Sequence, residues 1–141
     1  MADRKANATW KGGVADGKGN VALGSGLFEG AFSFATRMGD EPGTNPEELL
    51  GAALAGCYAM ALSAALERGG TTASEVSVEA NVHLGKDDSG FVIKGVDLNV
   101  TADVDGIDLE VDTRDVEEFI NSVRFLGPSF GGIVYAAFHG P

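Results

Sequence analysis

The sequence predicts an α+β fold, in which strands and helices come from separate stretches of the chain. Three observations lead to this prediction: short alternating segments before residue 37, a long apolar helix signal at residues 44–70, and two longer alternating segments after it. Strands and helices do not alternate regularly, so a parallel α/β sheet is not expected. The 141 residues fit a single domain, residues 1–141, that can bury a core without a disulfide or a structural metal.

Residues 8–23 predict an N-terminal hairpin, because apolar and polar side chains alternate on both sides of an Asp-Gly turn at residues 16–17. A third strand is expected where Phe32 and Phe34 alternate with small residues, and it should end near Arg37. Glycine and proline at residues 38–44 favour a loop. This loop leads into the long helix.

The long helix is predicted to run from Pro46 to about Arg68. Asn45 before it is a good N-cap, proline is tolerated at the first helical position, and two glutamates place negative charge in the first turn. The Gly69-Gly70 pair can supply the left-handed residue that ends a helix.

Residues 49–66 carry no charge, which is close to the length of a membrane span. A membrane span is not expected, because the run consists mostly of alanine and glycine and no basic cluster precedes it. A helix that is apolar on every side and built of small residues is typical of a buried central helix. One small sheet covers only one face of such a helix, so we expect a homodimer whose second copy supplies another layer.

Two alternating segments follow the helix, with apolar side chains on one face at residues 76–84 and again at residues 96–104. Residues 86–90 read as the hairpin loop between them, so the two strands should pair antiparallel. Apolar residues at helical spacing then predict a second, shorter helix: Val116, Phe119, Ile120 and Val123. A final strand is expected at Ile133 to Phe138.

The composition excludes several classes of function. A formal charge of -11 argues against a nucleic-acid or anionic-membrane partner, because clustered Lys and Arg are lacking. The N-terminal residues lack the apolar core of a signal peptide, and one cysteine excludes an internal disulfide, so we expect a cytoplasmic protein. Neither a phosphate or dinucleotide motif nor a zinc-type cluster is found, so no cofactor or metal is expected. His83 and His139 are not expected to act as a paired base or a metal ligand.

Cys57, near the middle of the long helix, has two interpretations on the residues alone. A single cysteine in an alanine-rich helix is commonly a buried packing residue, and an apolar mid-helix setting disfavours the reactive thiolate. A reactive Cys57 needs a nearby cation, and Arg37, just before the long helix, is the best placed. Glu47 and Glu48 are the nearest carboxylates that can hold a guanidinium, although both also suit a helix N-terminus.

The spacing of these residues adds a constraint. Ten residues separate Glu47 from Cys57, which corresponds to about 15 Å along an unbroken helix. That distance is too long for one site within one chain. Either the helix breaks, or Cys57 is served by the arginine and the glutamate of a second subunit.

Four segments carry a family resemblance: ATWKGG near the start, FATR at residues 34–37, GTNPEELLGAALAGCYAMAL at residues 43–62, and the two alternating strands that follow. Together they resemble the family of osmotically inducible protein C (OsmC) and the organic hydroperoxide resistance proteins (Ohr), over roughly residues 7–125. The resemblance implies an OsmC-like α+β fold with an antiparallel sheet wrapped around a long central helix. It also implies an intertwined homodimer and thiol peroxidase activity on organic hydroperoxides.

By the same resemblance, Cys57 corresponds to the peroxidatic cysteine, Arg37 to the arginine that activates it, and Glu47 to the carboxylate that holds the arginine. A site shared between two subunits, as the family implies, would answer the spacing problem. The chain departs from the family where a second, resolving cysteine is normally found before a proline: the matching place reads Leu126-Gly127-Pro128, and the chain has no other cysteine. The tail, residues 127–141, is also atypical of the family's last strand.

The leading hypothesis is a cytoplasmic, thiol-dependent peroxidase of the oxidative stress response. It reduces organic hydroperoxides through a single peroxidatic cysteine, with an external thiol or dithiol as reductant. The alternative is a catalytically impaired OsmC-like protein that keeps the fold and binds a small apolar ligand or a protein partner. A third possibility is that Cys57 joins two chains through an intermolecular disulfide.

Overall fold

The computed structural model describes residues 1–104 and 133–138 of the chain. The chain divides into two compact units, residues 1–49 and 50–141, and each is described by itself. Within the described residues the elements follow the order expected from the sequence, with three strands before the long helix and paired strands after it. The predicted shorter helix at Val116–Val123, the Leu126–Pro128 segment and His139 lie outside the described residues.

The first unit contains a three-stranded antiparallel sheet in the order β1-β2-β3, formed by β1 (Ala6–Lys11), β2 (Lys18–Leu23) and β3 (Glu29–Phe32). The predicted hairpin is confirmed. Gly19 of β2 pairs with Trp10 on one side and Phe32 on the other, and these two rings lie 5.4 Å apart between centroids. A Cβ at Gly19 would lie 2.4 Å from the Phe32 ring, so the two rings meet only because glycine stands between them.

The predicted third strand is partly wrong. β3 ends at Phe32, and residues Phe34–Met38 form a short helix, α1, so that Arg37 lies in a helix rather than at a strand end. The physical reason is a capping box: the Ser33 hydroxyl accepts from the Thr36 backbone N–H, and the Thr36 hydroxyl accepts from the Ser33 backbone N–H. Alternation of Phe32 and Phe34 favoured a strand, but the local side-chain bonds favour the helix.

The long helix, α2, spans Pro46–Arg68, as predicted. The Asn45 side chain accepts from the Glu48 backbone N–H at 2.8 Å, which confirms the N-cap. At the other end, the Thr71 backbone N–H donates to the Leu66 carbonyl, and Gly70 adopts a left-handed conformation with φ of +88°. Both helix ends are therefore set by the residues that the sequence identified.

The second unit pairs β4 (Glu75–Asp87) with β5 (Gly90–Asp103) antiparallel, as predicted, with a shorter loop than expected and a register shift between His83 and Leu84. The predicted last strand is confirmed as β6 (Ile133–Phe138). It pairs with β5 in parallel, which gives the order β4-β5-β6, so this second sheet is mixed rather than purely antiparallel.

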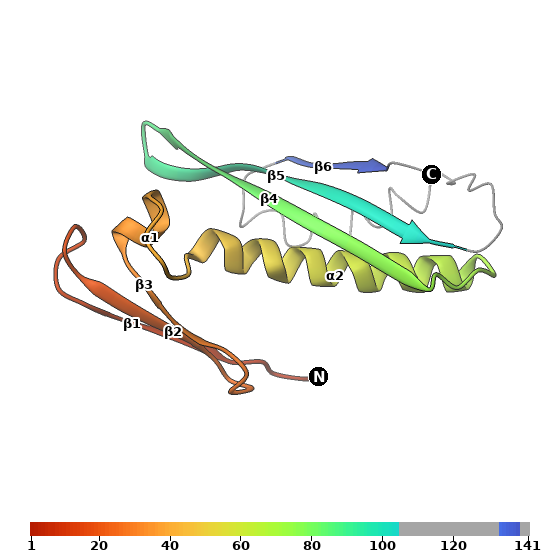
Figure 1. Cartoon of the computed structure of the whole chain (residues 1–141), viewed down its shortest axis with the longest axis horizontal. Coiled ribbons are helices and arrows are strands. Elements are labelled where there is room, and N and C mark those ends of the chain that lie inside the picture. Colours follow the sequence, from red (N-terminus) through yellow and green to blue (C-terminus); the bar gives the residue numbers. More distant parts are fainter. Residues whose placement is uncertain (105–132, 139–141) are drawn as a thin grey trace. The chain divides into compact units, whose positions relative to one another are not determined.

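The core of the second unit lies between α2 and one face of β4 and β5 (Figure 1). Its centre consists of Tyr58 from the helix and Leu98 and Val100 from β5, all less than 5% exposed. At Gly51 the helix comes close to β4, because a Cβ there would lie 3.1 Å from the Val82 side chain. Small residues in the helix therefore permit this close packing.

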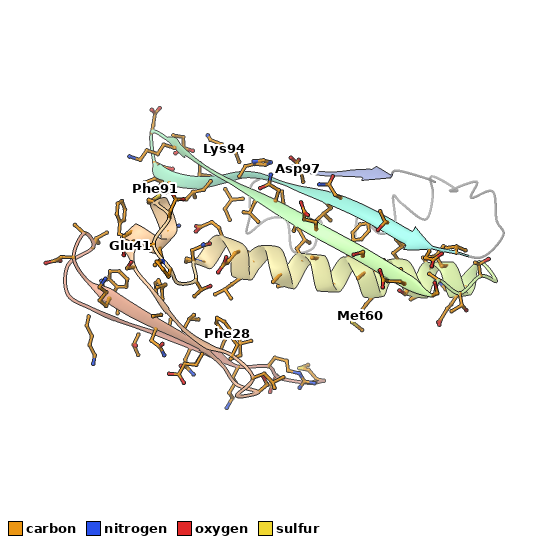
Figure 2. All side chains as sticks on the ribbon, viewed as in Figure 1. Phe28, Glu41, Met60, Phe91, Lys94 and Asp97 are labelled. Carbon is orange, nitrogen blue, oxygen red and sulfur yellow. The ribbon has the colours of Figure 1, made fainter. Side chains whose placement is uncertain are left out.

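Burial of α2 on every side was expected with a second copy of the chain supplying one layer, and within a single chain much of the described helix is exposed. The helix is long and apolar enough to cross a membrane by length and composition alone, and only 11% of its most apolar window is buried. Met60 is 77% exposed, and Figure 2 shows its side chain extending away from the sheet. The strands cover one face of α2 because a single sheet layer contacts a helix on one side only.

Tyr58 makes the stability of this core depend on pH in the alkaline range. Burial raises the pKa of its phenol above the ordinary value of 10.0. Above about pH 10 the unfolded chain loses the phenolic proton while the folded chain retains it, so this contribution to stability is complete below pH 10 and is lost as the pH rises further.

We expect urea unfolding at pH 9 and pH 11 to show that the wild type loses more stability between these values than Tyr58→Phe does. The phenylalanine variant removes the titrating hydroxyl and keeps the ring in the core. Equal losses in the two proteins would show that the folded chain does not hold this proton more tightly than the unfolded chain.

Candidate active site

Arg37 and Glu47 form an ion pair within the first unit. The Arg37 Nε–H donates to Glu47 Oε1 at 3.0 Å and to Oε2 at 3.1 Å, and Nη2 donates to Oε1 at 2.5 Å. Two guanidinium nitrogens thus contact one carboxylate, an arrangement that fixes the plane of the guanidinium as well as its position. The pair predicted from the sequence is present.

The two partners differ in exposure. The Glu47 side chain is 11% exposed, whereas that of Arg37 is 34% exposed. A buried carboxylate depends on its partner for compensation of charge, while a guanidinium that is one third exposed retains contact with water. Glu47 therefore depends on the pair more than Arg37 does.

Glu48, the other candidate carboxylate, has a different role. It is exposed, and its Oε1 accepts from the Thr44 hydroxyl at 2.6 Å. Its backbone N–H donates to the N-cap Asn45. The structure thus separates the two glutamates of the first turn: Glu47 binds Arg37, and Glu48 contributes to the start of the helix.

Cys57 is exposed on α2. The described residues of a single chain therefore do not bury this thiol. Its neighbour Tyr58 is 4% exposed, since consecutive residues of a helix point about 100° apart and only Tyr58 faces the sheet. α2 is continuous from Pro46 to Arg68, so the alternative in which the helix breaks between Glu47 and Cys57 is also wrong.

His83 was not expected to act as a paired base or a metal ligand, but it has a carboxylate partner on the neighbouring strand. Its Nε2 lies 2.7 Å from Oδ2 of Asp97, with both side chains about half exposed. The register places Gly95 opposite His83, and a glycine there leaves room for the ring to reach the diagonal Asp97. Figure 2 shows Asp97 on the side of β5 that faces away from α2. Among the described residues no group of His, Cys, Asp and Glu could hold a metal ion.

A family model described as OsmC-like protein matches residues 39–128, which is more than half of the chain. The chain belongs to the OsmC-like protein family. The match includes Glu47 and Cys57, and the family places this chain among the OsmC and Ohr proteins. The predicted α+β OsmC-like fold with a long central helix is therefore confirmed.

Among relatives of this OsmC-like chain, the Peroxiredoxin OsmC of Escherichia coli (strain K12) is 43% identical over 106 residues, which cover 74% of each chain. The crystal structure of the organic hydroperoxide resistance protein OhrB of Bacillus subtilis has a TM-score of 0.62 at 25% identity, covering 96% of this chain and 98% of that one. An organic hydroperoxide resistance protein OsmC from Legionella pneumophila reaches a TM-score of 0.68 at 22% identity, covering 96% and 97%.

A second similarity is much shorter. A stretch of 32 residues, 23% of the chain, is 81% identical to the NADP-dependent malic enzyme of Rhizobium meliloti, and it corresponds to 4% of that enzyme. Such a small part of an enzyme carries no argument about its activity. It shows that the OsmC-like chain also contains a segment that is similar to a protein of another kind.

One part of the surroundings of Arg37 was not predicted from the sequence. Ser33 and Thr44 are among the few buried polar side chains of the first unit, and the hydroxyl of Thr36, next to Arg37, donates to the Thr44 carbonyl oxygen. The signal was present: Ser33 with Thr36 three residues later resembles a capping box, but the alternation of phenylalanines concealed it. This bond connects the short helix that carries Arg37 to the segment before α2.

The unequal burial of the ion pair gives a prediction for stability. Arg37→Met leaves a buried carboxylate without its partner and should cost about 2–3 kcal/mol, whereas Glu47→Gln keeps an amide oxygen that accepts from the guanidinium and should cost about 1 kcal/mol. Chemical denaturation measures both. Arg68→Met, on an exposed arginine, is the control and should change stability by less than about 0.5 kcal/mol. A larger cost for Glu47→Gln than for Arg37→Met would contradict the asymmetry.

Proposed function

We propose that this chain is a cysteine-based peroxidase that reduces organic hydroperoxides, with Cys57 as the peroxidatic residue. The observation that carries the proposal is the preformed Arg37–Glu47 pair in a chain whose one cysteine is exposed on the following helix. The relative that is 43% identical is named a peroxiredoxin, and the structural neighbours are named organic hydroperoxide resistance proteins. Both names agree with this chemistry.

The first half of the reaction uses residue types that the chain possesses. The Cys57 thiolate attacks one oxygen of the O–O bond, which breaks, and the other oxygen leaves as an alkoxide that takes up a proton to become an alcohol. Cys57 becomes a sulfenic acid. The Arg37 guanidinium stabilises the negative charge of the thiolate and of the departing oxygen, and Glu47 holds the guanidinium in place.

The second half needs a partner, because the chain has no second cysteine. We assign it to an external thiol or dithiol. A first thiol condenses with the Cys57 sulfenic acid to give a mixed disulfide and water, and a second thiol releases Cys57 and leaves as a disulfide. The single-cysteine cycle thus balances without a resolving residue in the chain.

Within one chain, ten residues of continuous helix separate Glu47 from Cys57. This separation supports a site shared by two copies of a single OsmC-like domain, residues 1–141. Since α2 is continuous, Arg37 and Glu47 of one copy serve Cys57 of the other. The exposed apolar face of α2, which includes Met60, is the surface that a second copy covers, in preference to a lipid bilayer. The cytoplasm supplies the reducing thiols that this cycle requires.

The dimer leads to a prediction for assembly. Met60→Glu places a charge on the exposed apolar face of α2 and should raise the dissociation constant of the dimer at least tenfold, as measured by sedimentation equilibrium. Val14→Glu is the control, because Val14 is also exposed, at 72%, but lies in the turn after β1. A wild type that is monomeric at micromolar concentration would contradict the shared site.

A second candidate function is supported by two observations: the chain has no second, resolving cysteine, and the second unit has a shallow groove. The groove lies between α2 and β4 and is lined mainly by small and apolar side chains: Ala59, Met60, Ser63, Ala64, Glu67 and Val76. A catalytically impaired OsmC-like protein could bind a small apolar ligand or a protein partner there. Under this alternative Cys57 does not react with peroxide.

The peroxidase proposal predicts consumption of cumene hydroperoxide in the presence of excess dithiothreitol. Cys57→Ser should reduce the rate to that of buffer, and Arg37→Ala should reduce it by about 10²-fold, because a positioned charge is lost from the transition state. Arg68→Ala is the matched control and should keep the wild-type rate, because Arg68 ends α2 and is exposed.

Equal rates in the wild type, Cys57→Ser and Arg37→Ala would sink the peroxidase proposal. Intact mass after brief peroxide treatment distinguishes the two functions: one added oxygen at Cys57 supports the peroxidase, and an unchanged mass supports the binding protein. A covalent dimer on a non-reducing gel would instead identify an intermolecular disulfide through Cys57.

A further inference from the structure

The buried polar and charged side chains of the described chain all belong to the first unit. Ser33, Thr44 and Glu47 are 6%, 7% and 8% exposed, respectively, and they are the buried polar or charged residues of the described chain. Glu47 contacts the guanidinium directly. The Ser33 hydroxyl accepts from the backbone N–H of Thr36, the residue before Arg37. The Thr44 hydroxyl donates to Glu48, and the Thr44 carbonyl oxygen accepts from the Thr36 hydroxyl.

The Thr36 hydroxyl links two segments. It accepts from the Ser33 backbone N–H at 2.8 Å, within the capping box of α1. It lies 2.8 Å from the Thr44 carbonyl oxygen and 3.1 Å from that of Ser33, and these two acceptors share its single proton. Thr44 belongs to the segment immediately before the N-cap of α2, so the hydroxyl connects the helix of Arg37 to the start of the helix of Glu47.

The bond to Thr44 is not needed to cap α1. The Ser33 hydroxyl already accepts from the Thr36 backbone N–H at 3.2 Å, and this bond does not involve the Thr36 side chain. The loop also closes against the Thr36 methyl group: Gly43 has φ of +149°, and a Cβ there would lie 2.7 Å from Thr36 Cγ2. Both ends of the Thr36 side chain therefore contact the segment that leads into α2.

We propose that Thr36 is a positioning residue for the Cys57 reaction, because its hydroxyl holds the Arg37 and Glu47 helices at the spacing that their ion pair requires. The proposal rests on the proposed function, since Arg37 must act on Cys57. Thr36 itself contacts no reacting atom. It acts through the guanidinium, whose plane is fixed only while α1 and the start of α2 keep their spacing.

The test compares two variants. Thr36→Val replaces the hydroxyl with a methyl group of similar size, and Thr36→Ser keeps the hydroxyl. The rate constant for oxidation of Cys57 by cumene hydroperoxide should fall about tenfold in Thr36→Val and stay within about twofold of the wild type in Thr36→Ser, because about 1 Å of misplacement is costly to a preorganised site. Thr36→Ala, which also lacks the hydroxyl, is measured in parallel. If only one of Thr36→Val and Thr36→Ala folds, the rate constant of that variant still tests the positioning role.

An Arg37→Ala background separates positioning from folding. If Thr36 acts through the guanidinium, Thr36→Val should have no further effect once Arg37 is gone. A general loss of structure would lower the rate by the same factor in both backgrounds, and that result would overturn the proposal. Circular dichroism of each variant confirms that the compared proteins are folded.

A second readout does not depend on catalysis. The Arg37 Nε–H bond to Glu47 should protect this proton from exchange with water in ¹⁵N NMR spectra, and the protection should be lost in Thr36→Val, as in Glu47→Ala, and kept in Thr36→Ser. If the wild type reduces no hydroperoxide, the proposed function fails, and this exchange rate still decides whether Thr36 positions Arg37. Full protection in Thr36→Val would reject the positioning role.

Discussion

The ion pair between Arg37 and Glu47 is the interaction on which the site depends. A carboxylate that is largely withdrawn from water at the first turn of α2 is tolerated because a guanidinium from α1 compensates its charge. The same contact gives the arginine one orientation. The capping box of α1, the N-cap of α2 and the hydroxyl bridge between them all determine where these two groups lie.

Much of this arrangement could be predicted from the sequence. The caps of α2 are local, and Asn45, Pro46 and the closing glycines identified them directly. The antiparallel pairing of β4 and β5 follows from simple alternation. The residues alone left Glu47 and Glu48 open as partners of Arg37. The family resemblance selected Glu47, and the hydrogen bonds agree with that prediction.

The errors have physical causes. Phe34 and its neighbours alternate like a strand, but two reciprocal side-chain bonds over residues 33–36 favour one short helix. The pairing of His83 with Asp97 depends on a glycine opposite the ring, which requires knowledge of the strand register. The exposure of α2 could not be read from its composition, because small apolar residues suit a helix covered by its own chain or by another copy equally well.

The residues of α2 that face the sheet determine which sequence changes the helix tolerates. Gly51, Leu54, Tyr58 and Leu62 recur at helical spacing and pack toward β4 and β5, so they fix the rotation of the helix about its axis. Cys57 takes its direction from that rotation. Substitution among the exposed small residues leaves the direction unchanged, whereas one inserted or deleted residue between Gly51 and Tyr58 turns the thiol by about 100° relative to the earlier part of the helix. Length, rather than composition, is therefore the property of this segment on which the direction of the thiol depends.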